Sequence, residues 1–135
     1  MKYMLDTNIC IYLIKKQPEQ LLNKFKSCKS GDVCISTITL AELMYGVGKG
    51  QHSQKNKSAL EEFISPLEIM PFDQEATTHY GHIRAWLEKN GTPIGPLDLM
   101  IAAHAKSLHT TLVTNNKKEF IRVPKLKIED WSLSH

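Results

Sequence analysis

Short apolar segments alternate with helix-length segments along this chain, and that alternation limits the folds it can adopt. Buried strands are expected at residues 2–5, 33–35, 67–70 and 111–114, with a last edge strand within residues 127–131. The segments between them carry apolar side chains at helical spacing. Strands that alternate with helices pair in parallel through right-handed crossovers, with helices on both faces. The sequence therefore predicts an α/β fold, a three-layer α/β/α domain with a mostly parallel central sheet.

Capping residues place the helices between these strands. Thr7 or Asn8 is expected to cap the helix after the first strand, and Pro18 suits the first turn of the next one. A long helix is predicted over residues 74–90, with Asp73 as its cap. Helix starts therefore lie directly after strand ends, where open α/β sheets bind ligands.

Composition narrows the class of protein. The 135 residues, 1–135, are expected to form a single domain, and a net charge of +3 permits an acidic partner without requiring one. Three cysteines without a CxxC spacing argue against a disulfide framework or a zinc knuckle. No apolar run approaches the roughly 20 residues that span a bilayer, and Asp6 interrupts any signal-peptide core. We expect no membrane partner and a cytoplasmic location.

Several acidic or amide residues follow a strand or open a helix. They are Asp6, Glu42, Asp98 and the pair Asn116 and Glu119. Because the carboxyl ends of parallel strands meet at one edge of a sheet, these side chains are expected to gather there. The other carboxylates, Asp130 among them, are expected to face solvent.

Each of these residues also has a purely structural interpretation. Asp6 could cap a helix, and the segment Thr39-Leu40-Ala41-Glu42 fits a capping box. Asp98 could favour a helix N-terminus through the macrodipole alone. Asn116 could be a left-handed turn residue and Glu119 an ordinary surface charge. Taken singly, each structural interpretation is the stronger one.

Taken together, the acids favour a metal site. Carboxylates that converge repel one another, and their pKa values rise unless a cation compensates. Oxygen ligands without a nearby histidine or cysteine suit Mg²⁺ or Mn²⁺ rather than zinc. Such a site serves phosphodiester hydrolysis, because the metal polarises the phosphoryl group and activates a bound water.

Four motifs run from one end of the chain to the other. They are Met4-Leu5-Asp6-Thr7-Asn8, Ser36-Thr37-Ile38-Thr39-Leu40-Ala41-Glu42-Leu43, Gly95-Pro96-Leu97-Asp98-Leu99-Met100-Ile101-Ala102-Ala103-His104-Ala105 and Leu112-Val113-Thr114-Asn115-Asn116-Lys117-Lys118-Glu119-Phe120. In this order they resemble the motifs of PIN-domain ribonucleases and, within them, of the VapC toxins of bacterial toxin–antitoxin pairs. The resemblance implies a PIN-like fold.

The resemblance also implies roles for the acids. Asp6, Glu42 and Asp98 would be the catalytic acids that bind Mg²⁺ or Mn²⁺. Many PIN domains place a further aspartate after the last motif's strand, where this chain has asparagines. The resemblance therefore leaves the fourth position open: Asn116 could bind metal or water through its carbonyl, and Glu119 could supply the missing charge through a water. Both are expected to contribute.

Two hydroxyls adjoin these acids. Thr7 and Thr114 are candidates for orienting a carboxylate or contacting a phosphate. For the RNA backbone, the lysines of residues 49–57 and those beside Asn116 are the best candidates, since phosphate contact needs only flexible positive charge. His104 is expected to be an ordinary helix residue rather than a catalytic one.

By resemblance, the expected function is a metal-dependent endoribonuclease toxin. It would cut structured RNA, with the anticodon stem-loop of initiator tRNA as the family-level expectation, and stop translation until a VapB-type antitoxin neutralises it. A homodimer or a larger toxin–antitoxin assembly is expected. The antitoxin's C-terminal segment would lie on surplus apolar residues of the early helices, namely Ile9, Tyr12, Leu13, Leu40, Leu43, Met44 and Tyr45.

Two other functions are compatible with the sequence. The asparagines after the last motif's strand allow a catalytically degenerate PIN fold that only binds RNA or protein. A strand followed by Asp-Thr also occurs in haloacid-dehalogenase-like phosphatases. Those enzymes need a second aspartate two positions on, where this chain has Asn8, so this alternative ranks lower.

Overall fold

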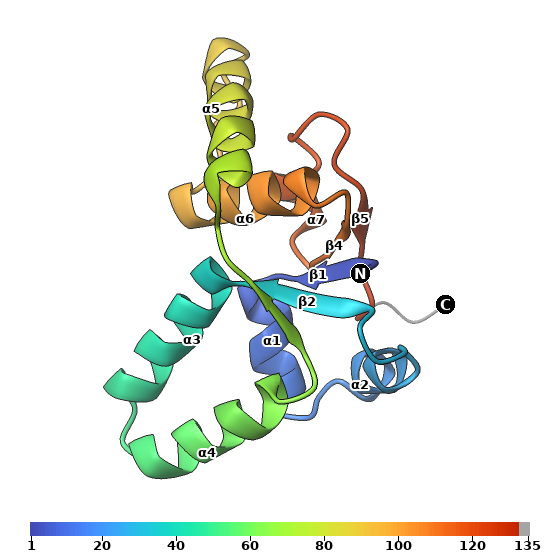
Figure 1. Ribbon diagram of the computed structural model, residues 1–135, viewed down its shortest axis with the longest axis vertical. Coiled ribbons are helices and arrows are strands. Elements are labelled where there is room, and N and C mark those ends of the chain that lie inside the picture. The colour runs from blue at the N-terminus through green and yellow to red at the C-terminus, as the bar shows by residue number, and fades with distance from the viewer. Residues whose placement is uncertain (133–135) are drawn as a thin grey trace.

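One five-stranded sheet forms the centre of the computed structural model, which describes residues 1–132 (Figure 1). Its strands are β1 (Tyr3–Leu5), β2 (Val33–Ser36), β3 (Glu68–Met70), β4 (Thr111–Val113) and β5 (Ile128–Glu129). They lie in the order β3-β2-β1-β4-β5, and every neighbouring pair is parallel. The predicted α/β fold with its edge strand near the C-terminus is confirmed.

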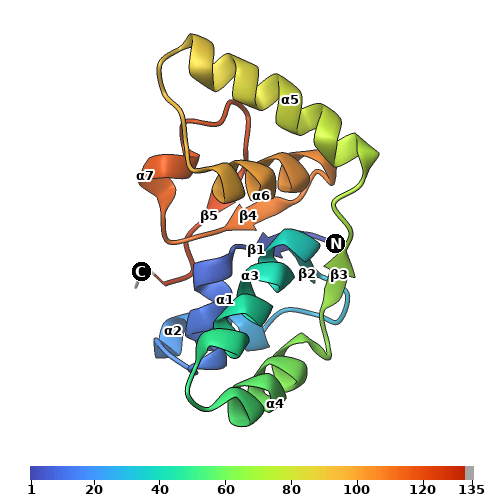
Figure 2. The same cartoon turned by 90° about the vertical axis from the view of Figure 1, so that its left-hand side faces the viewer.

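The helices divide between the two faces of the sheet (Figure 2). One face carries α1 (Thr7–Ile14), α2 (Glu19–Lys26), α3 (Thr37–Lys49) and α4 (Ser53–Ile64), and the other carries α5 (Gln74–Lys89), α6 (Pro96–Ser107) and α7 (Lys117–Phe120). This is the predicted three-layer arrangement. Within residues 1–132, no helix has the length and apolar character needed to cross a bilayer.

Each face of the sheet has its own hydrophobic core. Met4 of β1 and Leu112 of β4 pack on the side of α5 and α6, whereas Leu5 and Val113, the next residues along, pack on the side of α1 to α4. Successive side chains of a strand point to opposite faces, and in a covered parallel sheet both sets must be apolar. The short apolar runs of the sequence are therefore strands buried on both sides.

The ends of three strands lie side by side along the carboxyl edge of the sheet. Strands β1, β4 and β5 end in register, so the residues that follow them, Asp6, Thr114 and Asp130, come next to one another. The Asp6 amide donates to the Val113 carbonyl at 3.0 Å, and the Thr114 amide donates to the Glu129 carbonyl at 3.0 Å. This edge collects polar side chains from distant parts of the sequence.

The first helix begins one residue earlier than predicted. Asp6 is its N-cap, with extended backbone and a side chain that accepts from the Ile9 amide at 2.9 Å. Thr7 is already helical, so it and Asn8 cannot serve as the cap that was predicted. The strand and the helix are therefore joined directly at Asp6.

The capping box predicted at Thr39 is also wrong. Helix α3 starts at Thr37, and Ser36, the last residue of β2, caps it by accepting from the Ile38 amide at 3.0 Å. Glu42 is thereby placed in the second turn of α3, too far from the cap to bond its amide. Its carboxylate needs another explanation.

Other helix boundaries match the sequence more closely. Asp73 caps α5 as predicted, accepting from the Ala76 amide at 3.0 Å, and Gly91 ends the helix with a left-handed φ of 68°. Pro18 precedes α2 as its N-cap rather than lying in its first turn. Pro96 starts α6, which brings Asp98 into the first turn of that helix.

Candidate active site

Asp6 is a buried carboxylate at the carboxyl edge of the sheet. Its side chain is 4% exposed. Burial raises its pKa, and the negative charges of Glu42 and Asp130 raise it further. Hydrogen bonds from the Thr114 hydroxyl and from the Ile9 amide oppose this rise. Asp6 is thus both a helix cap and a charge held under repulsion, so the two interpretations made from sequence are compatible.

Asp98 faces the same cluster from the first turn of α6. Its pKa is raised to about 6, first by burial and then by the negative charges of Glu119, Asp6 and Glu42. An ordinary aspartate at a helix N-terminus would be stabilised as the anion, which lowers the pKa. Asp98 shows the opposite, so the helix macrodipole alone does not explain its position.

Glu42 reaches the cluster from α3. The Thr7 hydroxyl donates to Glu42 Oε1 at 2.6 Å, which joins the first turn of α1 to the second turn of α3. The predicted role of Thr7, orienting a carboxylate, has this contact in its support. One oxygen of Glu42 is thereby held, and its other oxygen makes no hydrogen bond with the residues that the structure describes.

Glu119 is held on both carboxylate oxygens. Its Oε1 accepts from the Gly95 amide at 2.8 Å, and its Oε2 accepts from Asn116 Nδ2 at 2.9 Å. A Cβ on Gly95 would lie 3.7 Å from Glu119 Oε1 and 3.9 Å from Asp98 Oδ2, so the two carboxylates lie beside each other at this glycine. Glu119 is not the free surface charge of the structural interpretation.

Asn116 supports this arrangement rather than forming a left-handed turn. Its φ is −104°, and it is the residue before α7. Its backbone amide donates to Thr114 Oγ1 at 2.9 Å, while its side-chain amide is bonded to Glu119. With its Nδ2 committed to Glu119, Asn116 connects the hydroxyl beside Asp6 with the carboxylate beside Asp98.

Asp130 is the acid that sequence reasoning missed. It was expected to face solvent, yet it is half-buried and its charge raises the pKa of Asp6. Its Oδ1 accepts from both the amide and the hydroxyl of Ser132, at 2.9 and 2.5 Å. The available signal was its position directly after the last strand, the same signal that identified Asp6.

The donor set of this cluster fits a hard divalent cation. Among residues 1–132, none of these acids forms an ion pair with a lysine, arginine or histidine. In the same region, no three acidic, histidine or cysteine side chains are already arranged to hold an ion. Mg²⁺ commonly binds through one or two carboxylates, with waters and substrate phosphates as its other ligands. A loose group of oxygen donors therefore suits Mg²⁺ better than a zinc-like closed cage.

His104 lies outside this cluster. It is 1% exposed, its Nδ1 is 2.8 Å from Ser36 Oγ, and its ring meets that of Phe72 edge to face. Burial lowers its pKa, which favours the neutral ring. As expected from sequence, it is a satisfied helix residue. Its contact fixes the start of α3 against α6, the two helices that carry Glu42 and Asp98.

An apolar groove begins beside Glu42. It runs between α1, α3 and α4 with a volume of about 380 Å³, and Ile14, Leu43 and Leu60 are among the residues that line it. The apolar residues that were expected to exceed what the core needs fall into two groups, one buried and one exposed. Ile9, Leu13 and Leu43 are buried and Leu40 packs against them, so they belong to the core, whereas Tyr12, Met44 and Tyr45 are 36%, 51% and 69% exposed.

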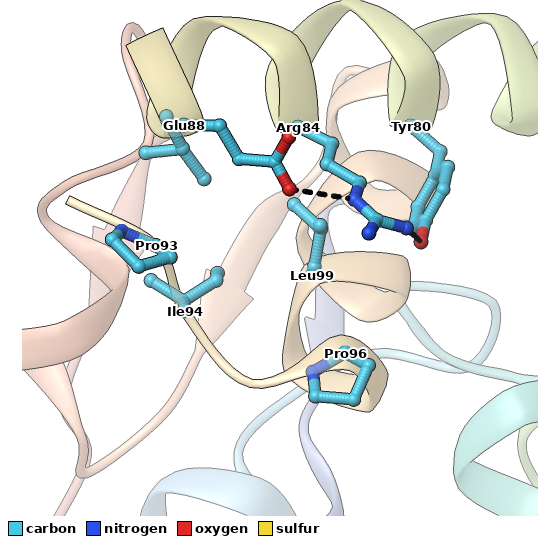
Figure 3. A pocket seen from close by; sticks show the side chains of 8 residues that line it. Tyr80, Arg84, Glu88, Pro93, Ile94, Pro96 and Leu99 are labelled. Carbon is cyan, nitrogen blue, oxygen red and sulfur yellow. Dashed lines mark hydrogen bonds and ion pairs between the residues drawn. The ribbon is translucent and has the colours of Figure 1, made fainter. Parts of the chain in front are cut away.

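A second hollow, of about 240 Å³, lies between α5 and α6 (Figure 3). Its only cationic group, Arg84, is already committed, because Nε pairs with Glu88 at 3.0 Å and Nη1 lies 3.0 Å from the Tyr80 hydroxyl. The rest of its wall is largely apolar, with Ile94 and Leu99 in Figure 3. Neither Asp6 nor Asp98 lines it, so it is separate from the acidic cluster.

Comparison with known proteins identifies the family of this chain. The PIN domain family model matches residues 3–126. The chain is 47% identical over 132 residues to the tRNA(fMet)-specific endonuclease VapC of Shigella flexneri, covering 98% of this chain and 99% of the relative. It is 48% identical to Ribonuclease VapC2 of Rickettsia felis, covering 97% and 98%.

Solved structures give the same result for the fold. The crystal structure of VapBC2 from Rickettsia felis bound to a promoter DNA fragment superposes with a TM-score of 0.92 at 46% identity, covering 97% of this chain and 99% of that one. DNA-bound VapBC from Salmonella typhimurium gives 0.92 at 48% identity, covering 97% and 98%. The chain belongs to the PIN-domain family, within its VapC group.

Proposed function

We propose that this chain is a metal-dependent endoribonuclease toxin that cuts tRNA. The observation that carries the proposal is the convergence of Asp6, Glu42, Asp98 and Glu119, whose charges oppose one another without a cationic partner among the described residues. Burying such a cluster is unfavourable unless a ligand with positive charge compensates it. The activities printed for the relatives, a tRNA(fMet)-specific endonuclease and a ribonuclease, support the same reaction.

In this proposal Asp6 and Asp98 hold the cation directly. Asp6 lies between β1 and α1 and Asp98 lies in α6, and each carries a pKa raised by burial and in part by the other acids. Bound Mg²⁺ or Mn²⁺ would polarise the scissile phosphoryl group and lower the pKa of a bound water. Glu42, held by the Thr7 hydroxyl, keeps one oxygen available for an ion or a water ligand.

In this mechanism Glu119 contributes a negative charge that is held at a fixed place beside Asp98. Both of its oxygens are bonded, so it adds negative charge beside Asp98 while Gly95 and Asn116 fix where that charge lies. Thr114 supports Asp6 by a hydrogen bond and also accepts from the Asn116 amide. These contacts favour Glu119 over Asn116 as the fourth residue of the site. Asn116 then holds Glu119 in place through its side-chain amide.

The groove beside Glu42 suggests how activity is controlled. We propose that a VapB-type antitoxin lays an apolar C-terminal segment in this groove, which Leu43 and Val47 of α3 help to line. Met44 and Tyr45 of the same helix remain exposed. An arginine or lysine of that segment would reach the carboxylates and compete with the cation. The solved VapBC complexes from relatives support such a partner. The same proposal includes a homodimer or a larger assembly with the antitoxin. It also includes a cytoplasmic location.

The test is cleavage of initiator tRNA by the purified chain. Asp6→Ala and Asp98→Ala are compared with the unchanged protein, with Mn²⁺ or Mg²⁺ and with EDTA. Glu62→Gln is the matched control, because Glu62 is an exposed carboxylate on α4 outside the cluster. We expect metal-dependent cleavage that both alanine variants abolish and the control retains.

The alternatives predict different results. A degenerate PIN fold would bind tRNA without cutting it under any metal condition. A haloacid-dehalogenase-like phosphatase would form an aspartyl-phosphate on Asp6, but Asn8, which stands where a second aspartate is required, is exposed on α1. Cleavage that continues in EDTA, or equally in the alanine variants, would refute the proposed mechanism.

A further inference from the structure

A third hollow, about 450 Å³ in volume, lies at the end of the sheet near β5. Lys24 of α2, Lys117 of α7 and the residues that follow β5 are among those that line it. Figure 2 shows α2 and α7 on the same side of the molecule, one on each face of the sheet. The hollow therefore joins the two helical layers at the carboxyl edge, where the acidic cluster lies.

The hollow and the cluster are neighbours on that edge. Asp130 lines the hollow and comes after β5, which is two strands away from Asp6 at the end of β1. Neighbouring strands are spaced by about 4.8 Å, which puts about 10 Å between the two positions. From the other side, Lys117 directly follows Asn116, which bonds Glu119. An RNA strand that ran from the acids along this edge toward β5 would pass this hollow.

The acids that line the hollow are already committed to hydrogen bonds. Glu129 Oε1 accepts from the Trp131 indole at 2.9 Å, and Asp130 Oδ1 accepts from the amide and hydroxyl of Ser132. Neither Lys24 nor Lys117 forms an ion pair with the residues that the structure describes. The ammonium group of Lys24 lies 6.0 Å from the centre of the buried Trp131 ring, at the wall of the hollow.

We propose that this hollow binds a backbone phosphate of the RNA substrate next to the scissile one, through Lys24 and Lys117. The inference rests on the proposed function, because it assumes RNA as the substrate. A nuclease with an acidic centre repels its polyanionic substrate, and cationic side chains just outside the centre offset that repulsion. Lys24 could not be found from sequence, since α2 reaches this edge only in the folded chain.

The test measures RNA affinity without hydrolysis. A short fluorescein-labelled single-stranded RNA is titrated in EDTA, by fluorescence anisotropy, over a range of salt concentrations. The variant Lys24→Gln with Lys117→Gln is compared with Lys26→Gln plus Lys29→Gln. That control removes the same charge from exposed lysines, with Lys29 at the opposite end of the sheet, before β2.

We expect the slope of log affinity against log salt to fall by about 1.4 in the Lys24/Lys117 variant, because each single-strand phosphate contact contributes about 0.7. At 0.1 M salt this corresponds to about 10- to 30-fold weaker binding. The control should lose less than about threefold, because Lys26 and Lys29 line a different hollow, beside Val33 and Leu67, and charges away from the RNA are screened by salt. Replacing both lysines with arginine should retain the binding.

Equal losses in the two glutamine variants, or no loss in either, would overturn the proposal, as would a loss that arginine does not restore. Unchanged RNA binding in the Lys24/Lys117 variant, together with intact metal-dependent tRNA cleavage, would refute the phosphate site in this hollow and leave the nuclease proposal standing. Loss of RNA affinity in the Lys24/Lys117 variant, with no cleavage by the unchanged protein, would instead refute the nuclease proposal alone.

Discussion

Replacing Asp98 by asparagine should stabilise the metal-free protein. The carboxylate is partly buried beside Glu119, Asp6 and Glu42, which raises its pKa to about 6 from an ordinary 3.8. Above pH 6 the folded chain therefore carries a charge that the unfolded chain holds at lower cost. Asparagine has nearly the same shape and no charge, so it removes this repulsion.

The magnitude follows from the two pKa values. A difference of about two pH units corresponds to about 3 kcal/mol. Asp98 is partly exposed, so solvent screens part of the repulsion, and we expect about half of that value, about 1.5 kcal/mol. For a domain of this size, the melting temperature should rise by about 3 to 6 °C.

The pH dependence gives the sharper test. Below pH 3.8 Asp98 is protonated in both states, so the variant should gain almost nothing. The gain should grow as the pH rises from about 4 to about 6 and then stay constant, because the folded carboxyl ionises last. Thermal melts in EDTA at pH 4, 5, 6 and 7.5 measure this.

Glu62→Gln, which removes an exposed charge, should change the melting temperature by less than about 1 °C at every pH. An Asp98→Asn variant that is no more stable at pH 7.5, or that is equally stabilised at pH 4, would refute the argument that the acids repel one another. Added Mg²⁺ should raise the melting temperature of the unchanged protein more than that of the variant.

Two further predictions concern the contacts that position the acids. Thr7→Val should lower kcat for tRNA cleavage by about tenfold with little change in stability, because Glu42 loses its 2.6 Å partner. Thr7→Ser, which keeps the hydroxyl, should retain the rate. A full rate in the valine variant would contradict this role of Thr7. Ser36→Ala should lower the free energy of unfolding by about 2 to 3 kcal/mol in urea titrations, since it removes a helix cap and leaves Nδ1 of buried His104 without its partner. A loss below about 0.5 kcal/mol would show that neither bond matters.

The sheet could be predicted because its signal is local. Runs such as residues 33–35 and 111–114 are apolar on both faces, and their alternation with helical segments leaves a parallel sheet as the natural arrangement. Helix starts were less certain, because Asp6, Thr7 and Asn8 are all acceptable caps in isolation. Only the backbone of the folded chain, extended at Asp6 and helical at Thr7, selects among them.

The sequence by itself determined that Asp6 follows a strand and that Asp98 opens a helix, and the order of its motifs was enough to indicate a PIN domain. The tertiary structure decided which other groups join them. Glu119 is fixed by the amide of Gly95, 24 residues away, and Asp130 affects Asp6 only because β5 lies two strands from β1. Strand order and long-range hydrogen bonds depend on packing between distant segments, and no local residue pattern encodes those distances.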